Sequence, residues 1–418
     1  MTAGSSGRCI QMRFPLHLLS KGSNQMKTRA LLIALAATAI LAACGQNVSQ
    51  PADKPAPETE AVEASRPAVD GRAIVADIGK INTPNGIEES FAAPIGGVDQ
   101  WLSIRGKDRD NPVILIVHGG PGSAELAIGW TFQRGWEDYF TVVQWDQRGA
   151  GKTYSLTDPD AVIPTLSVDR MKADVIEVAE LVRQRLGKEK VILLGHSWGT
   201  IIGLQAAVER PDLFAAYAAH GQVINMQRNE EEGFRLTLEA AKADGNTEAV
   251  EALEALEPYP DDLTVERIGD QRTWSIHYGG LAAYRQDAAP WFRAMRLSAD
   301  YDDAVLNGYD AGSLASITAL MPELRAVDMD AITTSPVPVF LLHGRQDLTT
   351  PPTASAAWFD RLSAPAKAEY WFDHSAHLAF MEEPGAVLMT LVTCIRPYAA
   401  EPDMDAARAK AAACVQAE

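Results

Sequence analysis

The stretch VILLGHSWGTIIGLQAAVE, residues 191–209, decides the fold of this 418-residue chain. Its first four residues are apolar, as in a buried strand, and the part from Thr200 to Glu209 has the composition of a helix. Between them Ser197 stands among small residues, with glycine at 195 and 199, so the chain can turn sharply without side chains colliding. We expect the helix N-terminus to favour negative charge that develops beside the serine hydroxyl. The pattern predicts a nucleophilic serine at the tip of a strand–turn–helix unit.

A glycine-rich loop precedes this turn in the chain. The apolar run from Pro112 to Val117 predicts a strand that leads directly into His118-Gly-Gly-Pro-Gly122. An ordinary strand-to-loop turn would also use these residues. The loop and the serine turn, in this order, nevertheless resemble the α/β-hydrolases. The resemblance implies an oxyanion hole formed by the backbone N–H groups of Trp198 and Gly120.

The other members of a catalytic triad are expected further along, in the order acid and then histidine. Val337 to Leu342 predicts a strand, and Asp347 follows it, where a carboxylate is well placed to orient an imidazole. After the strand-like segment Ala368 to Phe372 come two histidines, His374 and His377, which compete for the role of general base. We favour His377, because it lies where a loop meets a helical segment, and the test is whether it reaches the serine.

Four motifs taken together resemble the prolyl iminopeptidases, over about residues 85 to 400. These are HGGPG (118–122), DQRGAG (146–151), the serine turn, and GRQD (344–347) with His377. The resemblance implies a serine aminopeptidase that releases N-terminal proline through an acyl-enzyme, with no cofactor. Two residues depart from the family pattern: His196 stands where glycine is common, and Lys152 stands where a serine usually follows the DQRG segment. General esterases of the fold also carry a histidine at the position of His196, so a carboxylesterase or thioesterase acting on small acyl substrates is the alternative. A non-catalytic surface binding protein is a remote one, against which the intact triad argues.

The spacing of apolar runs predicts a single α/β-hydrolase domain with an insertion. We expect a mostly parallel eight-stranded sheet with helices on both faces and a helical cap inserted after the sixth strand. The domain would comprise residues 78–221 and 336–418, and the cap residues 222–335. A helix with one apolar face is predicted from Asp169 to Leu186. The expected strands are Glu88–Ala93, Val98–Ile104, Val113–Val117, Phe140–Trp145, Val191–Leu194, Phe214–Ala219, Val339–Leu342 and Ala368–Phe372.

The cap is expected to select the substrate. The resemblance implies acidic side chains there that hold the free α-amine of the substrate, and apolar walls that hold the proline ring. Glu230 is the first candidate for the amine contact and Glu231 the second, although a run of charges on a helix is often a solvated face. Trp274 and Tyr278 are candidate walls of the pocket; aromatic residues of a cap also commonly pack against the domain below.

The N-terminal region predicts an exported lipoprotein. From Met26 a charged segment, a short apolar stretch and Leu-Ala-Ala precede Cys44, as in a bacterial signal peptide that ends in a lipidation site. Residues 1–43 would be a leader, with the signal peptide at 26–43, and residues 44–77 a lipidated cysteine and a disordered tether. The protein would then be membrane-anchored, facing the periplasm from the outer membrane. The alternative is a cleaved signal peptide with an incidental cysteine.

The net charge and the cysteines indicate which partners and which disulfide to expect. The formal net charge is −18, and loss of the five basic residues of the leader would make it −23, so nucleic-acid binding is not expected. In an oxidising compartment, Cys394 and Cys414 are expected to form a disulfide. No metal site is expected. The partner is a peptide or small-molecule substrate, the only membrane contact is through the lipid anchor, and the oligomeric state is left open.

Overall fold

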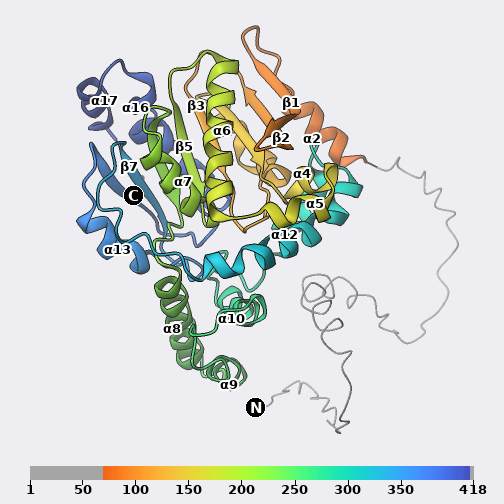
Figure 1. Ribbon diagram of the computed structural model, residues 1–418, viewed down its shortest axis with the longest axis vertical. Helices are drawn as coiled ribbons and strands as arrows, with labels where there is room; N and C mark the ends of the chain where they lie inside the picture. The colour runs from red at the N-terminus through yellow and green to blue at the C-terminus, as the bar shows by residue number, and fades with distance from the viewer. Residues whose placement is uncertain (1–68, 415–418) are drawn as a thin grey trace, which may run out of the picture. The chain divides into compact units, whose positions relative to one another are not determined.

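The computed structural model describes residues 69–414, and an eight-stranded sheet organises them (Figure 1). The strand order is β1-β2-β4-β3-β5-β6-β7-β8. Strand β2 runs antiparallel to β1 and β4, and the other neighbouring pairs are parallel. All eight predicted strands are present, and their ends differ from the predicted ranges by at most two residues. The strands are β1 (Ile87–Ile95), β2 (Val98–Gly106), β3 (Val113–Val117), β4 (Thr141–Asp146), β5 (Val191–His196), β6 (Phe214–His220), β7 (Val339–Gly344) and β8 (Lys367–Phe372).

Helices connect these strands and cover both faces of the sheet. Before β6 they are α2 (Gly71–Gly79), η2 (Leu126–Thr131), α3 (Gln133–Trp136), α4 (Gly151–Leu156), α5 (Pro159–Val162), η3 (Ile163–Thr165), α6 (Val168–Leu186) and α7 (Trp198–Glu209). Between β6 and β7 they are α8 (Met226–Asp244), α9 (Thr247–Glu254), α10 (Val265–His277), α11 (Ala289–Ala294), η4 (Met295–Leu297) and α12 (Asp303–Leu324). After β7 they are α13 (Pro352–Arg361), α14 (Ala379–Glu382), α15 (Pro384–Thr390), η5 (Leu391–Ile395), α16 (Pro397–Ala400) and α17 (Met404–Ala411).

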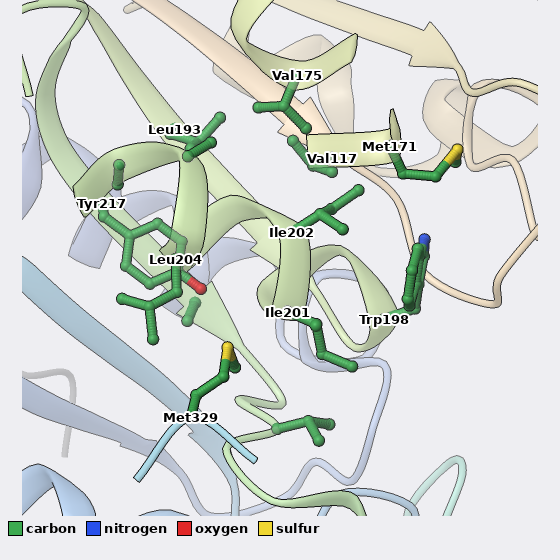
Figure 2. Packing of buried hydrophobic residues seen from close by; sticks show 14 of the residues in the cluster. Val117, Met171, Val175, Leu193, Trp198, Ile201, Ile202, Leu204, Tyr217 and Met329 are labelled. Atoms are coloured by element: carbon green, nitrogen blue, oxygen red, sulfur yellow. The ribbon is translucent and has the colours of Figure 1, made fainter. Parts of the chain in front are cut away.

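Strand β3 shows how the sheet separates two hydrophobic cores. Because side chains alternate along a strand, Leu115 packs in the core that contains α6 and α7, whereas Ile114 packs in the core that contains η5. Both faces are covered, which explains why the parallel strands are continuous apolar runs. Figure 2 shows the first core, where Ile202 of α7 lies near Val117 of β3 and Val175 of α6.

Helix α6 confirms the predicted amphipathic helix. Its buried apolar residues include Val175, Val178, Ala179 and Val182, which share one face at helical spacing. The Ser167 side chain caps its first turn by accepting a hydrogen bond from Arg170 N–H, and Gly187 ends it in a left-handed conformation with φ 64°.

The helical cap follows the sixth strand, as expected, and extends from one end of the sheet, where α8, α9 and α10 project in Figure 1. Helix α12 returns along the domain and packs against α4. The prediction for the other end of the chain was wrong in part. The tether was expected to reach residue 77, but α2 begins at Gly71, because Asp70 caps it by accepting a hydrogen bond from Ala73 N–H.

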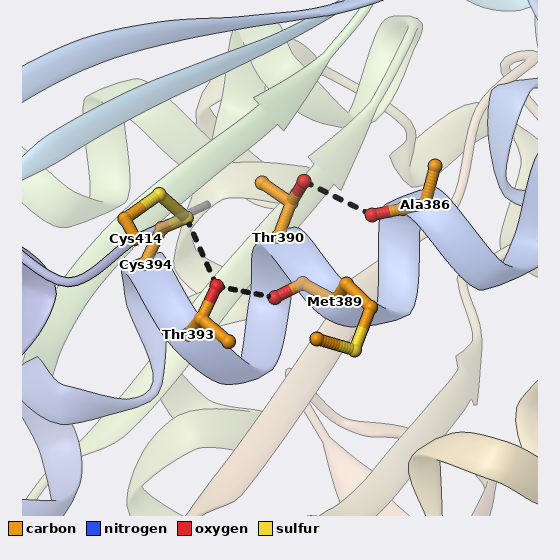
Figure 3. Close-up of a disulfide and its surroundings, with 6 residues drawn as sticks. All are labelled: Ala386, Met389, Thr390, Thr393, Cys394 and Cys414. Carbon is orange, nitrogen blue, oxygen red and sulfur yellow. Dashed lines mark hydrogen bonds between the residues drawn. A yellow bond between two sulfur atoms is a disulfide. The ribbon is translucent and has the colours of Figure 1, made fainter. Parts of the chain in front are cut away.

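Cys394 in η5 and Cys414 beyond α17 form a disulfide (Figure 3). Their Cα atoms are 4.9 Å apart, and the bond closes a chain separation of 20 residues. Closing a loop of that length stabilises a protein by about 3 kcal/mol in the chain-entropy description. Residues Met26 and Cys44, the leader and most of the expected tether lie outside the described residues. Within residues 69–414 no helix is both long enough and apolar enough to cross a membrane.

Candidate active site

Ser197 occupies a sharp turn between β5 and α7. Its backbone has φ 53° and ψ −122°, a conformation that residues other than glycine rarely adopt. The flanking glycines are required by space: a Cβ on Gly195 would lie 2.9 Å from the Gly199 carbonyl oxygen, and one on Gly199 would lie 2.0 Å from the Val117 carbonyl oxygen. The turn therefore holds Ser197 at the carboxyl end of the sheet.

The glycine-rich loop after β3 lies directly against this turn. A Cβ on Gly119 would be 3.1 Å from the Ser197 Cβ, and Gly120 has φ +115°, which favours glycine. Trp198 is the first residue of α7, where helix geometry leaves the backbone N–H without an intrahelical acceptor. The two N–H groups assigned to an oxyanion hole thus belong to adjoining segments beside Ser197.

Gln147 of the DQRGAG motif connects these two segments. Its Oε1 accepts a hydrogen bond of 3.0 Å from the Trp198 indole N–H, and its Nε2 donates one of 2.8 Å to the His118 carbonyl. Its backbone N–H donates to His118 Nε2 at 3.1 Å. The motif therefore fixes the walls of the site.

The same motif contains two buried charged residues. Arg148 forms a buried ion pair of 2.9 Å with Asp174 of α6 and donates to the Gly96 carbonyl between β1 and β2. Burial raises the pKa of Asp146 to about 7, and its Oδ2 accepts hydrogen bonds from Tyr301 and from the Lys152 N–H. The motif thus ties the site to the edge of the sheet and, through Tyr301, to the cap.

Asp347 and His377 meet beyond the ends of β7 and β8. The Asp347 Oδ2 lies 2.8 Å from His377 Nδ1 and also accepts a hydrogen bond of 2.8 Å from the Thr350 hydroxyl. Its Oδ1 accepts the backbone N–H groups of Thr349 and Thr350, both at 2.8 Å. Burial alone would raise the pKa of Asp347, but the imidazole and the hydrogen bonds from Thr350 bring it below its usual value.

The structure distinguishes the two candidate histidines. His374 is exposed, and its Nδ1 lies 3.4 Å from the Tyr284 hydroxyl. His377 is buried and bonded to Asp347; its burial lowers its pKa, the effect of Asp347 opposes this shift, and the charge of His196 adds to it. Among residues 69–414, Ser197 makes no hydrogen bond to His377, and such contacts are often loose without a substrate.

A cavity of about 220 Å³ opens beside Ser197. Ser197, Trp198 and Gly120 form part of its wall, and Glu230 and Arg272 come from the cap. Most of the remaining wall is aliphatic: Ile201, Val223, Met226, Ile268, Ile317, Met321 and Leu324.

The predicted amine contact Glu230 lies at this cavity, but other groups hold its carboxylate. Arg272 Nη2 donates to Glu230 Oε1 at 2.5 Å, and the Tyr259 hydroxyl donates to Oε2 at 2.5 Å. The Glu230 side chain is 0% exposed and that of Arg272 is 18% exposed. Arg272, which the sequence reasoning missed, is thus a second charged residue in the wall of the cavity, and it is paired with Glu230.

The other predicted substrate contacts do not line the cavity. Glu231 is exposed on α8, because it follows the inward-facing Glu230 by one residue, about 100° around the helix. Trp274 and Tyr278 are half-buried and pack against the main hydrophobic core. The structure therefore does not bring these three residues to the cavity beside Ser197.

Glu125, which precedes η2, makes a buried contact that the sequence did not reveal. Its carboxylate forms an ion pair with Nδ1 of His196, the residue before the nucleophile, and accepts a hydrogen bond of 3.3 Å from Gly119 N–H. The other ring nitrogen of His196 lies 3.0 Å from the carbonyl oxygen of His377. No motif could have identified Glu125, since its partner is 71 residues away in the chain.

Comparison with known proteins agrees with this geometry. The family model for the alpha/beta hydrolase fold matches residues 112–384. The chain is 31% identical over 301 residues to "Probable aminopeptidase YbaC" of Bacillus subtilis, which covers 71% of this chain and 93% of that protein. It is 25% identical over 299 residues to the proline iminopeptidase of Lactobacillus delbrueckii subsp. bulgaricus, covering 69% of this chain and 92% of that protein.

A solved structure shares the fold. The crystal structure of VinJ matches with a TM-score of 0.53 at 20% identity, over 74% of this chain and 98% of VinJ. Together the sheet, the site and the family model show that the chain belongs to the α/β-hydrolase family, as a hydrolase similar to the aminopeptidases and proline iminopeptidases.

Proposed function

We propose that this protein is a serine aminopeptidase that releases a small apolar N-terminal residue, proline above all, from peptides. The observation that carries the proposal is the placement of Ser197, at a strained turn, in the wall of a mostly aliphatic cavity near the Asp347–His377 pair. The similarity to an aminopeptidase over most of both chains supports the peptidase reaction.

In the proposed reaction Ser197 attacks the carbonyl carbon of the N-terminal residue. His377 Nε2 accepts the serine proton, and Asp347 keeps the proton of the ring on Nδ1, so that Nε2 is the basic nitrogen. The imidazolium then protonates the leaving peptide amine, and the acyl group remains on Ser197. Water, deprotonated by His377, releases the free amino acid.

The negative charge of the tetrahedral intermediate would lie between the N–H groups of Trp198 and Gly120. Such donors are fixed before the reaction, and the loss of one costs about 3 kcal/mol of transition-state stabilisation in other enzymes. The left-handed backbone of Gly120 and the first turn of α7 supply this preorganisation here.

The size and walls of the cavity support a small apolar residue. Pockets for drug-sized ligands have about 300–1,000 Å³, and a cavity of about 150 Å³ binds benzene. A cavity of about 220 Å³ with aliphatic walls therefore fits one five-membered ring or a short aliphatic side chain.

An aminopeptidase must bind the free α-amine of its substrate, and Glu230 is the proposed partner of that amine. For an ammonium to reach Glu230, Arg272 must turn away, and the exchange would keep the buried carboxylate paired with a cation. A prolyl arylamide with a free amine should be cleaved at least about tenfold faster than its N-acetylated form, as expected for a hydrogen bond to a charged group.

Glu230→Gln should reduce this preference, and Glu231→Gln is the matched control, since its side chain lies one position along the same helix and points to solvent. Equal rates on free and acetylated substrates would contradict the aminopeptidase assignment and leave the triad untouched.

The pairing of Glu230 with Arg272 favours a second candidate function. The pair is neutral overall, and with the aliphatic wall it suits an uncharged acyl group, as in a carboxylesterase. The same substrates separate the two functions: an esterase would prefer a short acyl ester and gain nothing from a free amine.

The cellular location belongs to the same proposal. The sequence of residues 26–44 supports export and lipidation at Cys44, which would tether the enzyme to the outer membrane. Intact-mass measurement of the protein from membranes should show a lipidated Cys44 as the first residue, and Cys44→Ser should prevent membrane association. An unmodified cysteine or an attached leader would contradict this location.

A further inference from the structure

The hydrogen bonds of His196 require a charged imidazole ring. Its Nδ1 faces the Glu125 carboxylate and its Nε2 faces the His377 carbonyl oxygen at 3.0 Å. Burial alone would raise the pKa of Glu125, but the charge and hydrogen bond of His196 bring it below its usual value, so the carboxylate is ionised. An ionised carboxylate and a carbonyl oxygen only accept, so both ring nitrogens must carry a proton. Burial alone would lower the pKa of His196, but the charge and hydrogen bond of Glu125 raise it above its usual value. The ring next to the nucleophile is therefore an imidazolium.

His220 is the other ring near the His377 carbonyl, and its partners make it neutral. Burial lowers the pKa of His220 to about 3. Its Nδ1 donates to the Leu342 carbonyl at 2.9 Å, and its Nε2 accepts the Ala379 N–H at 3.3 Å. The same Nε2 lies 2.9 Å from the His377 carbonyl oxygen. A neutral ring has one proton, and because the Ala379 N–H donates to Nε2, that proton lies on Nδ1. The approach of His220 Nε2 to the His377 carbonyl is therefore not a hydrogen bond, and His196 is the ring that donates to it.

Glu125 and His196 therefore connect the three loops that form the site. Glu125 holds the glycine-rich loop through Gly119 N–H, His196 belongs to the nucleophile turn, and its Nε2 holds the backbone of the base. On the other side, the His377 N–H donates to the Leu281 carbonyl at 3.1 Å. The backbone of His377 is thus fixed from both sides, and its side chain is fixed by Asp347.

We propose that the buried Glu125–His196 ion pair is a positioning device for catalysis, which holds the backbone of His377 so that its ring meets Ser197. Glu125 and His196 are positioning residues, because they act through His377 and do not contact the substrate. The inference rests on the proposed roles of Ser197 and His377 and does not depend on whether the substrate is a peptide or an ester.

The pair also acts on the base through its charge. The rings of His196 and His377 are 4.7 Å apart, and the imidazolium disfavours protonation of the base. Other charged or titratable groups that face these two rings are Glu125, His118, His220, Asp347 and Arg272. Burial lowers the pKa of His118 to about 4, so that ring is neutral. Removal of the positive charge of His196 should therefore make His377 easier to protonate.

Two substitutions test the pair. Glu125→Gln keeps the shape and a hydrogen bond but removes the negative charge, and His196→Gln removes the imidazolium itself. Each should slow hydrolysis, and phosphonate labelling of Ser197, by about ten- to a hundredfold, since a misplacement of 1 Å at a catalytic group costs about a hundredfold. KM should change little. In both variants the acidic limb of the pH profile of kcat/KM should move to higher pH.

Glu137→Gln is the matched control. Like Glu125, Glu137 is a buried glutamate in an ion pair; its partner is Arg105, at 2.8 Å, and the pair lies away from the site. This substitution should lower the free energy of unfolding and leave labelling and the pH profile unchanged. The inference is overturned if the Glu125 and His196 variants behave like this control, with lower stability but wild-type labelling and pH dependence. If one of the two variants does not fold, the labelling rate and pH profile of the other variant test the inference. A wild-type protein that is not labelled at Ser197 would instead contradict the proposed function.

Discussion

Replacement of Asp347 by asparagine tests how the site controls the tautomer of its base. The Oδ1 of Asp347 accepts two backbone N–H groups, from Thr349 and Thr350, so an asparagine must keep its oxygen at that position. Its NH₂ group would then take the place of Asp347 Oδ2, which lies 2.8 Å from His377 Nδ1. Because two donors cannot share a hydrogen bond, His377 must move its proton to Nε2.

In that tautomer the nitrogen that should accept the serine proton already carries one. We expect kcat to fall by about 10⁴, or about 5 kcal/mol of transition-state stabilisation, with little change in KM. The assay is hydrolysis of a chromogenic substrate together with the rate of phosphonate labelling, on protein whose thermal unfolding has been checked. Asp373→Asn is the control, since Asp373 is exposed and pairs with Arg345. Activity within tenfold of the wild type would refute the assigned role of Asp347.

Three further predictions concern the nucleophile, the base and pH. Ser197→Ala should abolish both hydrolysis and phosphonate labelling with the circular dichroism spectrum unchanged, and turnover by the pure variant would rule out a serine mechanism. His377→Ala should lower kcat by about 10⁴ or more, whereas His374→Ala, which changes an exposed ring, should have little effect, and the reverse result would show that the base was misassigned. Since the pKa of His377 is lowered from its usual value of 6.5 and the base must be neutral, kcat/KM should stay high at pH 6.5 and fall only below it; a midpoint above 6.5 would contradict the burial argument.

The strands of the sheet and the positions of the candidate catalytic residues could be predicted because both follow from local sequence.

 Buried parallel strands are apolar on both faces, so runs such as Val113–Val117 are recognisable without any partner. The candidate catalytic residues Ser197 and Asp347 follow the ends of such strands, and for this reason the sequence alone could locate them.

The contacts of the cap could not be predicted in the same way. Glu230 lies at the cavity, but its partner Arg272 is on another helix and 42 residues away in the chain. Helical position alone does not say whether an aromatic residue such as Trp274 faces a cavity or a neighbouring helix. The ion pair of Glu125 with His196 is of the same kind, since it exists only once the loops have come together.

The cap joins two strands, β6 and β7, that are neighbours in the sheet. The insertion therefore begins and ends within one part of the scaffold, whereas Gly120, Ser197, Asp347 and His377 all follow strands of the sheet itself. Residues 222–335 can be exchanged as a unit where the replacement also keeps the carbonyl that Leu281 offers to the His377 N–H and the hydroxyl that Tyr301 donates to Asp146. A chimaera that takes the cap of a relative and keeps these two contacts is therefore a practical route to an enzyme with a different substrate.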